Sequence, residues 1–157
     1  MSPFDDDLTL AQAKEMLRVL LQAGHAIQCP TCQQLAKVYR RKISSRMAFT
    51  LIEVWNAAGN EWCHVPTTVT FTGDSGEISK LRYWGLVEEE TVRREDGGRA
   101  GYWRVTNLGR SWLLGNVRVA KYARIYDGNL LNLDESERVS ITDALGDKFD
   151  YRELMNQ

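Results

Sequence analysis

The stretch spanning residues 76–87, GEISKLRYWGLV, begins with helical spacing and ends as a strand. Ile78 and Leu81 lie about one helical turn apart, which predicts a buried helix face. Gly85 suits the left-handed backbone that ends many helices, and Leu86-Val87 opens a run typical of a strand. The sequence therefore predicts a helix that ends at this glycine and continues directly into a β-sheet.

Two strand-like runs separated by a glycine-rich turn follow this helix. Residues 86–94 and 101–106 have strand-like composition, and residues 95–99 supply turn residues that tolerate a positive φ. Thr106 or Asn107 can cap a short helix that comes next. The order of helix, strand, turn and strand predicts a helix backed by a β-hairpin, or wing.

The chain begins with another predicted helix, at residues 9–23, which carries an apolar stripe. Thr9 and Gln12 fit a capping box at its start. Pro30, which cannot donate a backbone hydrogen bond, makes residues 25–33 a turn.

A central helix is predicted to begin at Ser44 or Ser45 and to end at Gly59. Residues 61–65 have the composition of a short extended piece. Residues 66–72 have room for one helical turn, although β-branched residues make that turn a poor one.

A second hairpin is predicted near the C-terminus. Asp127 and Gly128 are turn residues between the strand-like runs 122–126 and 130–133. The acidic tail, residues 140–155, has the pattern of one or two short helices.

Charge is distributed in blocks although the net charge is only −1. Residues 25–52 carry five basic and no acidic side chains, and residues 99–124 carry six basic and no acidic ones. Two basic segments set between acidic ones predict a cationic face that the pI near 6.1 conceals.

Composition excludes several classes of protein. No apolar run reaches the length of a membrane span, roughly 18 residues, and the acidic start is unlike a signal peptide, so we expect a cytoplasmic protein. Phosphate-binding glycine motifs, HExxH and a nucleophile elbow are absent from the sequence. Cys63 and His64 are adjacent on a predicted strand and point to opposite faces, which argues against a catalytic pair. We therefore expect no enzyme.

The stretches ISKLRYWGLVEE and REDGGRAGYWRVTNLGRSWL resemble the recognition helix, wing and following helix of MarR-type winged-helix regulators. The likeness covers residues 44–114, and the order of segments also resembles small uncharacterised winged-helix proteins of tailed bacteriophages. It implies an α+β fold with a winged helix-turn-helix core at 44–115. An N-terminal helix and basic connector (1–43) would precede this core, and a C-terminal β-hairpin with short helices (116–157) would pack on it.

The same resemblance implies a sequence-specific double-stranded DNA-binding protein that regulates transcription. The helix at 74–84 would enter the major groove. A helical wheel places Ser75, Gly76, Ser79 and Tyr83 opposite Ile78 and Leu81, with Lys80 and Arg82 on the flanks. Arg99, near the tip of the wing at 93–101, matches an arginine that enters the minor groove in the family. The expected DNA contacts are Ser75, Ser79, Lys80, Arg82, Tyr83, Arg94, Arg99, Lys37, Arg40, Arg41, Lys42 and Arg46. The alternative is an ordinary solvated helix face and a solvated basic connector.

The cysteines suggest half of a metal site. Cys29 and Cys32 have the spacing of one zinc knuckle, with a proline between them. Together with His64 and either Cys63 or His25 they could complete a tetrahedral zinc site. The alternative is a set of reduced thiols without metal.

Two further expectations concern partners. A two-fold homodimer through the helix at 9–23 would place two reading helices one turn of DNA apart, whereas a monomer results if that helix folds onto its own core. The rival function is a protein-interaction module that binds and modulates a host enzyme or complex through a winged-helix scaffold.

Overall fold

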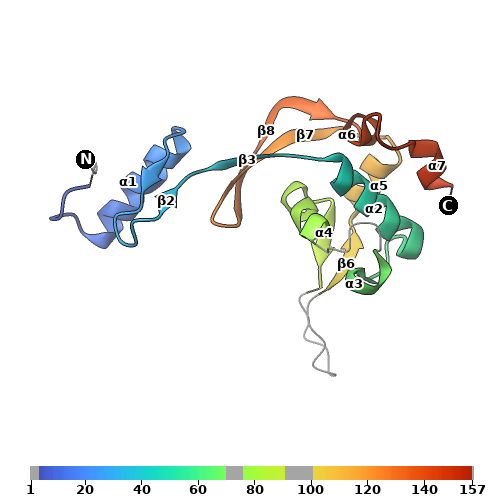
Figure 1. Cartoon of the computed structure of the whole chain (residues 1–157), viewed down its shortest axis with the longest axis horizontal. Coiled ribbons are helices and arrows are strands. Elements are labelled where there is room, and N and C mark those ends of the chain that lie inside the picture. The colour runs from blue at the N-terminus through green and yellow to red at the C-terminus, as the bar shows by residue number, and fades with distance from the viewer. Residues whose placement is uncertain (1–3, 70–75, 91–100, 157) are drawn as a thin grey trace, which may run out of the picture.

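Helix α2 (Ser45–Ala58) lies at the centre of the helical core, in contact with α3, α4, α6 and α7 (Figure 1). The computed structural model describes residues 4–69, 76–90 and 101–156. The Ser44 side chain accepts a hydrogen bond from the Met47 backbone N–H, and Gly59 ends the helix. The predicted bounds of this helix are therefore confirmed. Its buried residues are Met47, Ala48, Thr50, Leu51, Ile52 and Val54.

A small antiparallel sheet lies beside α2, with its three strands in the order β4-β6-β5. The strands are β4 (Cys63–His64), β6 (Tyr102–Val105) and β5 (Val87–Glu89). The one-turn helix α3 (Val65–Thr68) follows β4 directly. The three strands fall within the segments for which the sequence predicts them, and α3 begins one residue before the predicted segment 66–72. Residues 91–100, between β5 and β6, lie outside the described residues.

The stretch that begins at Gly76 folds as helix α4 (Gly76–Leu81) and one 3₁₀ turn, η1 (Arg82–Trp84). Gly85 then adopts the left-handed backbone, with a φ of 72°, so the predicted glycine stop is confirmed. The apolar side chains at 78, 81 and 84 are buried in the core. The Trp84 indole N–H donates to the Ala120 carbonyl at 2.7 Å, which ties this turn to the C-terminal half of the chain.

Helix α5 (Asn107–Leu113) is packed tightly against the end of this turn. The Thr106 side chain caps α5 by accepting from the Gly109 N–H, and it donates to the Gly85 carbonyl at 2.6 Å. A Cβ added at Gly109 would lie 2.1 Å from the carbonyl oxygen of Leu86. Only glycine therefore permits this approach of α5 to the first sheet.

A second antiparallel sheet has the order β3-β7-β8. Its strands are β3 (Tyr39–Lys42), β7 (Val119–Tyr126) and β8 (Asn129–Val139). The predicted hairpin at Asp127 and Gly128 is confirmed, and its second strand is longer than expected. The basic block, by contrast, is not the connector that the sequence suggested, because it forms a strand that pairs with β7.

The C-terminal tail forms two short helices, as predicted: α6 (Ile141–Leu145) and α7 (Tyr151–Met155). The Asn56 side chain of α2 donates to the Leu154 carbonyl at 2.8 Å. The Phe49 and Phe149 rings lie 4.7 Å apart. The tail is therefore packed on the central helix.

The N-terminal arm, residues 4–36, stands apart from this core (Figure 1). It consists of α1 (Leu10–Gln22) and a hairpin of two short strands, β1 (Ile27–Gln28) and β2 (Leu35–Ala36). The predicted capping box at Thr9 is present. Only two residues of α1, Ala13 and Leu21, are buried.

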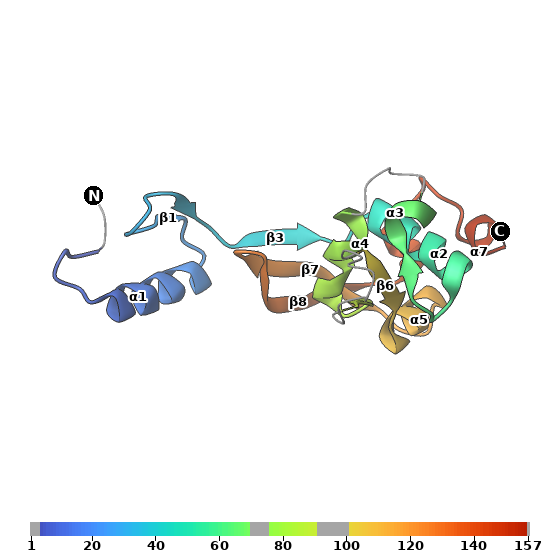
Figure 2. The same ribbon diagram turned by 90° about the horizontal axis from the view of Figure 1, so that it is seen from below.

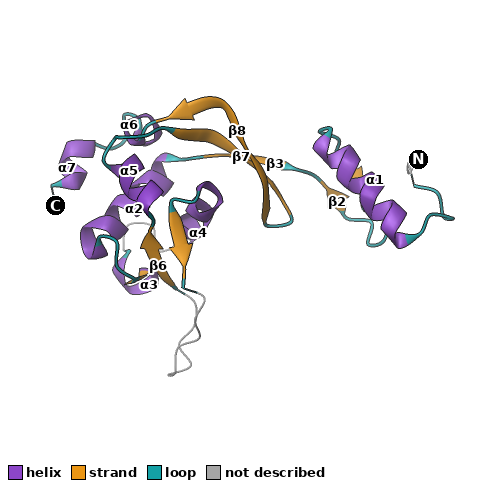
Figure 3. Ribbon diagram, turned by 180° about the vertical axis from the view of Figure 1, so that it is seen from behind, coloured by secondary structure: helices purple, strands orange, loops and turns teal. Residues whose placement is uncertain are grey.

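The molecule is elongated, with the arm at one end and the helical core at the other (Figure 2). Strand β3 and the β7–β8 ribbon connect the two ends (Figure 3). The fold is thus α+β, with small antiparallel sheets.

Candidate nucleic-acid interface

A groove lined by charged, polar and aromatic residues separates the α4–η1 segment from the inner face of the β3-β7-β8 sheet. The cavity has a volume of about 350 Å³. Three of its lining residues are cationic, Arg41, Lys80 and Arg82, and one is acidic, Asp127. The complete lining is Tyr39, Arg41, Ser79, Lys80, Arg82, Tyr83, Ile125, Asp127 and Gly128. The predicted basic block and the predicted reading helix, far apart in sequence, therefore line one groove.

Tyr83 lies under the tip of the β7–β8 hairpin. Its hydroxyl donates to the Gly128 carbonyl at 2.9 Å, and its ring is packed against the core. The neighbouring Arg82 guanidinium stacks on this ring at 4.8 Å and donates to the same carbonyl at 3.4 Å. The predicted outward orientation of Tyr83 is wrong. A helical wheel shows only the residues of the helix itself, and the hairpin that covers this face of the helix lies 45 residues later in the chain.

Ser79 and Lys80 lie on the side of α4 that borders the groove. The Ser79 hydroxyl donates to the Gly76 carbonyl at 2.8 Å. The Lys80 ammonium forms an ion pair with Glu77 at 2.9 Å, and both side chains are mostly covered. A ligand at this helix would therefore meet a lysine whose charge is partly balanced within its own helix.

The basic block divides between the two faces of β3, because neighbouring residues of a strand point to opposite sides. Arg41 lines the groove. On the other face, Arg40 lies 3.6 Å above the Tyr122 ring and forms an ion pair with Asp134 at 3.3 Å. Hydrogen bonds from Ser136, and then the Arg40 guanidinium, lower the pKa of the Asp134 carboxyl. Arg40 is therefore already engaged within the sheet.

The other predicted phosphate ligands are exposed. Lys42 ends β3 and Arg46 lies in the first turn of α2, and neither forms an ion pair within the part of the chain that the structure describes. The Lys37 ammonium lies 5.8 Å above the Tyr39 ring. Three of the predicted contacts, Ser75, Arg94 and Arg99, lie outside the described residues.

The predicted metal ligands are not brought together. Cys29 and Cys32 lie in the β1–β2 turn of the arm, whereas Cys63 is buried in the core. His64 hydrogen-bonds the Thr67 hydroxyl at 2.8 Å. Among residues 4–69, 76–90 and 101–156, no three His, Cys, Asp or Glu side chains form a cluster that could hold a metal ion.

The turn that carries Cys29 has its own chemistry. The Cys29 sulfur lies 3.2 Å from the Thr31 hydroxyl and also accepts hydrogen bonds from the backbone N–H groups of Thr31 and Cys32. The Thr31 hydroxyl, followed by these backbone donors, lowers the pKa of the Cys29 thiol to about 6. Burial raises the pKa of Tyr126, and the negative charges of Asp127, Cys29 and Cys32 raise it further. A thiolate is thus favoured at this turn near neutral pH.

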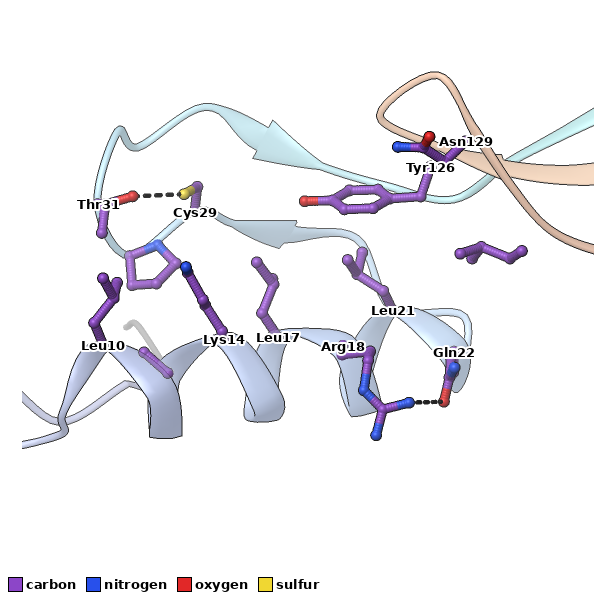
Figure 4. Close-up of a pocket in the computed structure, with 13 residues that line it drawn as sticks. Leu10, Lys14, Leu17, Arg18, Leu21, Gln22, Cys29, Thr31, Tyr126 and Asn129 are labelled. Atoms are coloured by element: carbon purple, nitrogen blue, oxygen red, sulfur yellow. Dashed lines mark hydrogen bonds between the residues drawn. The ribbon is translucent and has the colours of Figure 1, made fainter.

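A second cavity, of about 470 Å³, is apolar and lies between α1, this turn and the end of the β7–β8 hairpin (Figure 4). Leu17 and Leu21 of α1 point into it from one side and Tyr126 from the other. This groove was not predicted from the sequence. The sequence signal that could have revealed it is the pair of adjacent leucines just after the Asp127-Gly128 turn, Leu130 and Leu131, which are both 40% exposed.

No helix among the described residues has the length and apolarity to cross a membrane. Comparisons with protein-family models, with curated proteins and with solved structures give no match.

Proposed function

We propose that the chain binds double-stranded DNA through a winged-helix core and regulates transcription. Support comes from the order of elements α2, β4, α3, α4, β5, β6, which is that of a winged helix, and from the pairing of β5 with β6 directly after α4. In this arrangement the helix before the hairpin is the one that enters the major groove.

The observation that carries the proposal is the groove between α4–η1 and β3, with its three cationic side chains. It joins Arg41 of the basic block to Ser79 and Lys80 of the reading helix. Phosphate contacts supply most of the affinity for DNA, and cations beside the polar side of a helix can contact both phosphates and base edges. Two segments with independent signals for DNA therefore share one surface.

In the proposed complex, α4 lies in the major groove and β3 runs along a neighbouring phosphate backbone. Ser79 and Lys80 would contact base edges, while Arg41, Lys42 and Arg46 would contact phosphates. Tyr83 and Arg82 would instead hold the β7–β8 hairpin against the helix, so that the hairpin limits how deeply α4 enters the groove.

Salt dependence tests the phosphate assignment. The triple variant Arg41→Ala, Lys42→Ala, Arg46→Ala should bind a random-sequence duplex more weakly, and the slope of log affinity against log salt should fall by up to about three units. Fluorescence anisotropy at a series of salt concentrations measures both quantities.

A charge-matched control removes three exposed cations elsewhere, with Arg110→Ala, Lys148→Ala and Arg152→Ala. This variant should keep the wild-type slope, because α5 and the tail lie away from the groove. An equal loss of DNA affinity in the two variants would show that net charge, not the groove, determines binding. A wild-type protein that does not bind a duplex at low salt would overturn the proposal.

Sequence reading needs a separate measurement. Ser79→Ala should reduce affinity for a selected best site by about 1–3 kcal/mol while changing random-duplex binding much less. An equal effect on both duplexes would contradict the assignment of α4 as the reading helix.

The second candidate, a protein-interaction module, is favoured by one observation: the apolar groove between α1 and the β7–β8 hairpin. Apolar grooves of this kind accommodate partner side chains. If this function holds, binding to the partner will change little with salt, and Leu131→Asp will abolish it without affecting DNA.

A further inference from the structure

The β1–β2 turn has the backbone geometry of a metal-binding knuckle. Backbone hydrogen bonds join the Cys29 N–H to Gln34 at 2.8 Å and the Gln33 N–H to Cys29 at 3.0 Å. Gln33 has a positive φ of 65°, which tightens the turn directly after Cys32. The backbone N–H groups of Thr31 and Cys32 both point at the Cys29 sulfur. The Cys32 thiol also hydrogen-bonds the Cys29 sulfur, so the turn places two sulfur ligands side by side.

Two thiolates fill only half of the coordination sphere that zinc adopts in structural sites, which is tetrahedral and closed by four protein ligands. No third His, Cys, Asp or Glu of the described residues joins the pair in a cluster. Asp5 and Asp6 line a neighbouring hollow with Cys29 without completing such a set. Within the described residues the pair thus stands without further ligands, and a second molecule can supply the other two.

The position of the knuckle favours a second copy of the chain. The turn lies on the arm, which projects from the core (Figures 1 and 2), so the core of one molecule does not obstruct the approach of another. Cys32 is exposed and Cys29 is partly exposed. Lys14 lines the adjacent groove with Cys29 and offsets part of the negative charge of four thiolates.

We propose that Cys29 and Cys32 form half of an intermolecular zinc site, completed by the same two cysteines of a second copy. One Zn²⁺ ion then holds two chains together through four thiolates. Each thiol that binds the ion releases its proton to solvent, and no oxidant or reductant takes part. This inference is independent of DNA binding, and the two can fail separately.

The experiment uses the full chain, purified with a reductant and freed of metal with a chelator. Adding Zn²⁺ should bind half an equivalent per chain and double the mass measured by light scattering from 17.9 kDa. Renewed addition of chelator should restore the monomer. Cobalt in place of zinc should give the absorption spectrum of a tetrahedral four-thiolate site.

Variants identify the ligands. Cys29→Ser with Cys32→Ser should remain monomeric and free of zinc, while its far-UV circular dichroism stays that of the wild type. His25→Ala is the matched control on the same arm and should still bind half an equivalent. His64→Ala and Cys63→Ala should behave like this control, because both residues belong to β4, which is not part of the arm.

Three outcomes overturn the inference. One zinc per monomeric chain would show a site completed within the molecule. A dimer that persists with chelator and in the double variant would show association through apolar surface instead. Failure to bind zinc at micromolar concentration would show that the knuckle is structural only.

Discussion

The core and the N-terminal arm are each built around an amphipathic helix of similar length, yet only the core covers the apolar face of its helix. Helix α2 has 14 residues, of which six are buried, and α1 has 13, of which two are buried. Both helices start at a side-chain cap and show helical apolar spacing. The local sequence thus specifies a helix in both places, but it does not specify whether other segments pack on the apolar face of that helix.

The attachment of the arm is correspondingly small. Arg124 of β7 donates to the carbonyl of Gln22 at the end of α1, at 3.2 Å, and Tyr126 faces α1 across the apolar groove. Because most of the apolar surface buried in the molecule belongs to the core, we expect the arm to open locally at low free energy while the core unfolds cooperatively.

The largest expected effect on stability comes from a substitution in the core. Trp112 is fully buried in α5, and its indole N–H donates to the Val139 carbonyl at 3.1 Å. Trp112→Ala should lower the free energy of unfolding by about 3–5 kcal/mol, because it leaves a cavity and an unpaired carbonyl. Urea denaturation followed by circular dichroism measures this change, and a loss below about 1 kcal/mol would contradict the assigned core.

The features that sequence predicted are those determined over a few residues. The cap at Ser44, the left-handed stop at Gly85 and the turn at Asp127 and Gly128 each follow from the chemistry of one or two residues. The apolar spacing at 78, 81 and 84 was equally local. These signals were sufficient for the α+β class and for the bounds of α1, α2 and α5 to within about one residue.

The features that sequence missed depend on contacts between distant segments. Residues 39–42 form a strand because β7, some 80 residues later, pairs with them, and every side chain of that strand is exposed, so it shows no apolar alternation. Tyr83 is covered by a hairpin whose tip lies 45 residues on. The separation of Cys29 from Cys63 is likewise a property of how far the arm projects from the core.

A smaller effect is expected where the hairpin meets η1. Tyr83→Phe removes the hydrogen bond to the Gly128 carbonyl and should lower the free energy of unfolding by about 0.5–1.5 kcal/mol. Tyr39→Phe is the matched control, because Tyr39 is 58% exposed, and it should be neutral. Equal stability of the two variants, measured by urea denaturation, would show that this hairpin contact contributes nothing.

A still smaller effect is expected in the arm. Val19 lies in the middle of α1 with 52% of its surface exposed. Val19→Ala should change the global free energy of unfolding by less than about 0.5 kcal/mol, since little apolar surface is lost and alanine favours the helix. A loss of several times that size in urea denaturation would show that α1 is covered in solution, and would favour the predicted homodimer through this helix.

The last prediction concerns Cys29, where we expect a change in reactivity rather than in stability. Its pKa of about 6, against an ordinary 9.0, means that most of this thiol is thiolate at neutral pH. In metal-free protein, the rate of its alkylation by iodoacetamide should be half-maximal near pH 6 and level off above neutrality. Thr31→Val removes the hydroxyl that makes the largest contribution, so it should move this midpoint upward.

The lowered pKa of Cys29 also determines how the stability of the folded arm changes with pH. Because the pKa is lowered in the folded arm, its hydrogen bonds favour folding above the ordinary pKa, and this contribution disappears as the pH falls through about 6. Peptide mass spectrometry after timed alkylation separates Cys29 from Cys63, which is buried in the core and should stay unmodified until the core unfolds. If the Cys29 rate instead keeps rising to pH 9, the turn does not stabilise a thiolate. If Cys63 reacts as fast as Cys29, the core opens as readily as the arm, and the contrast between the two regions fails.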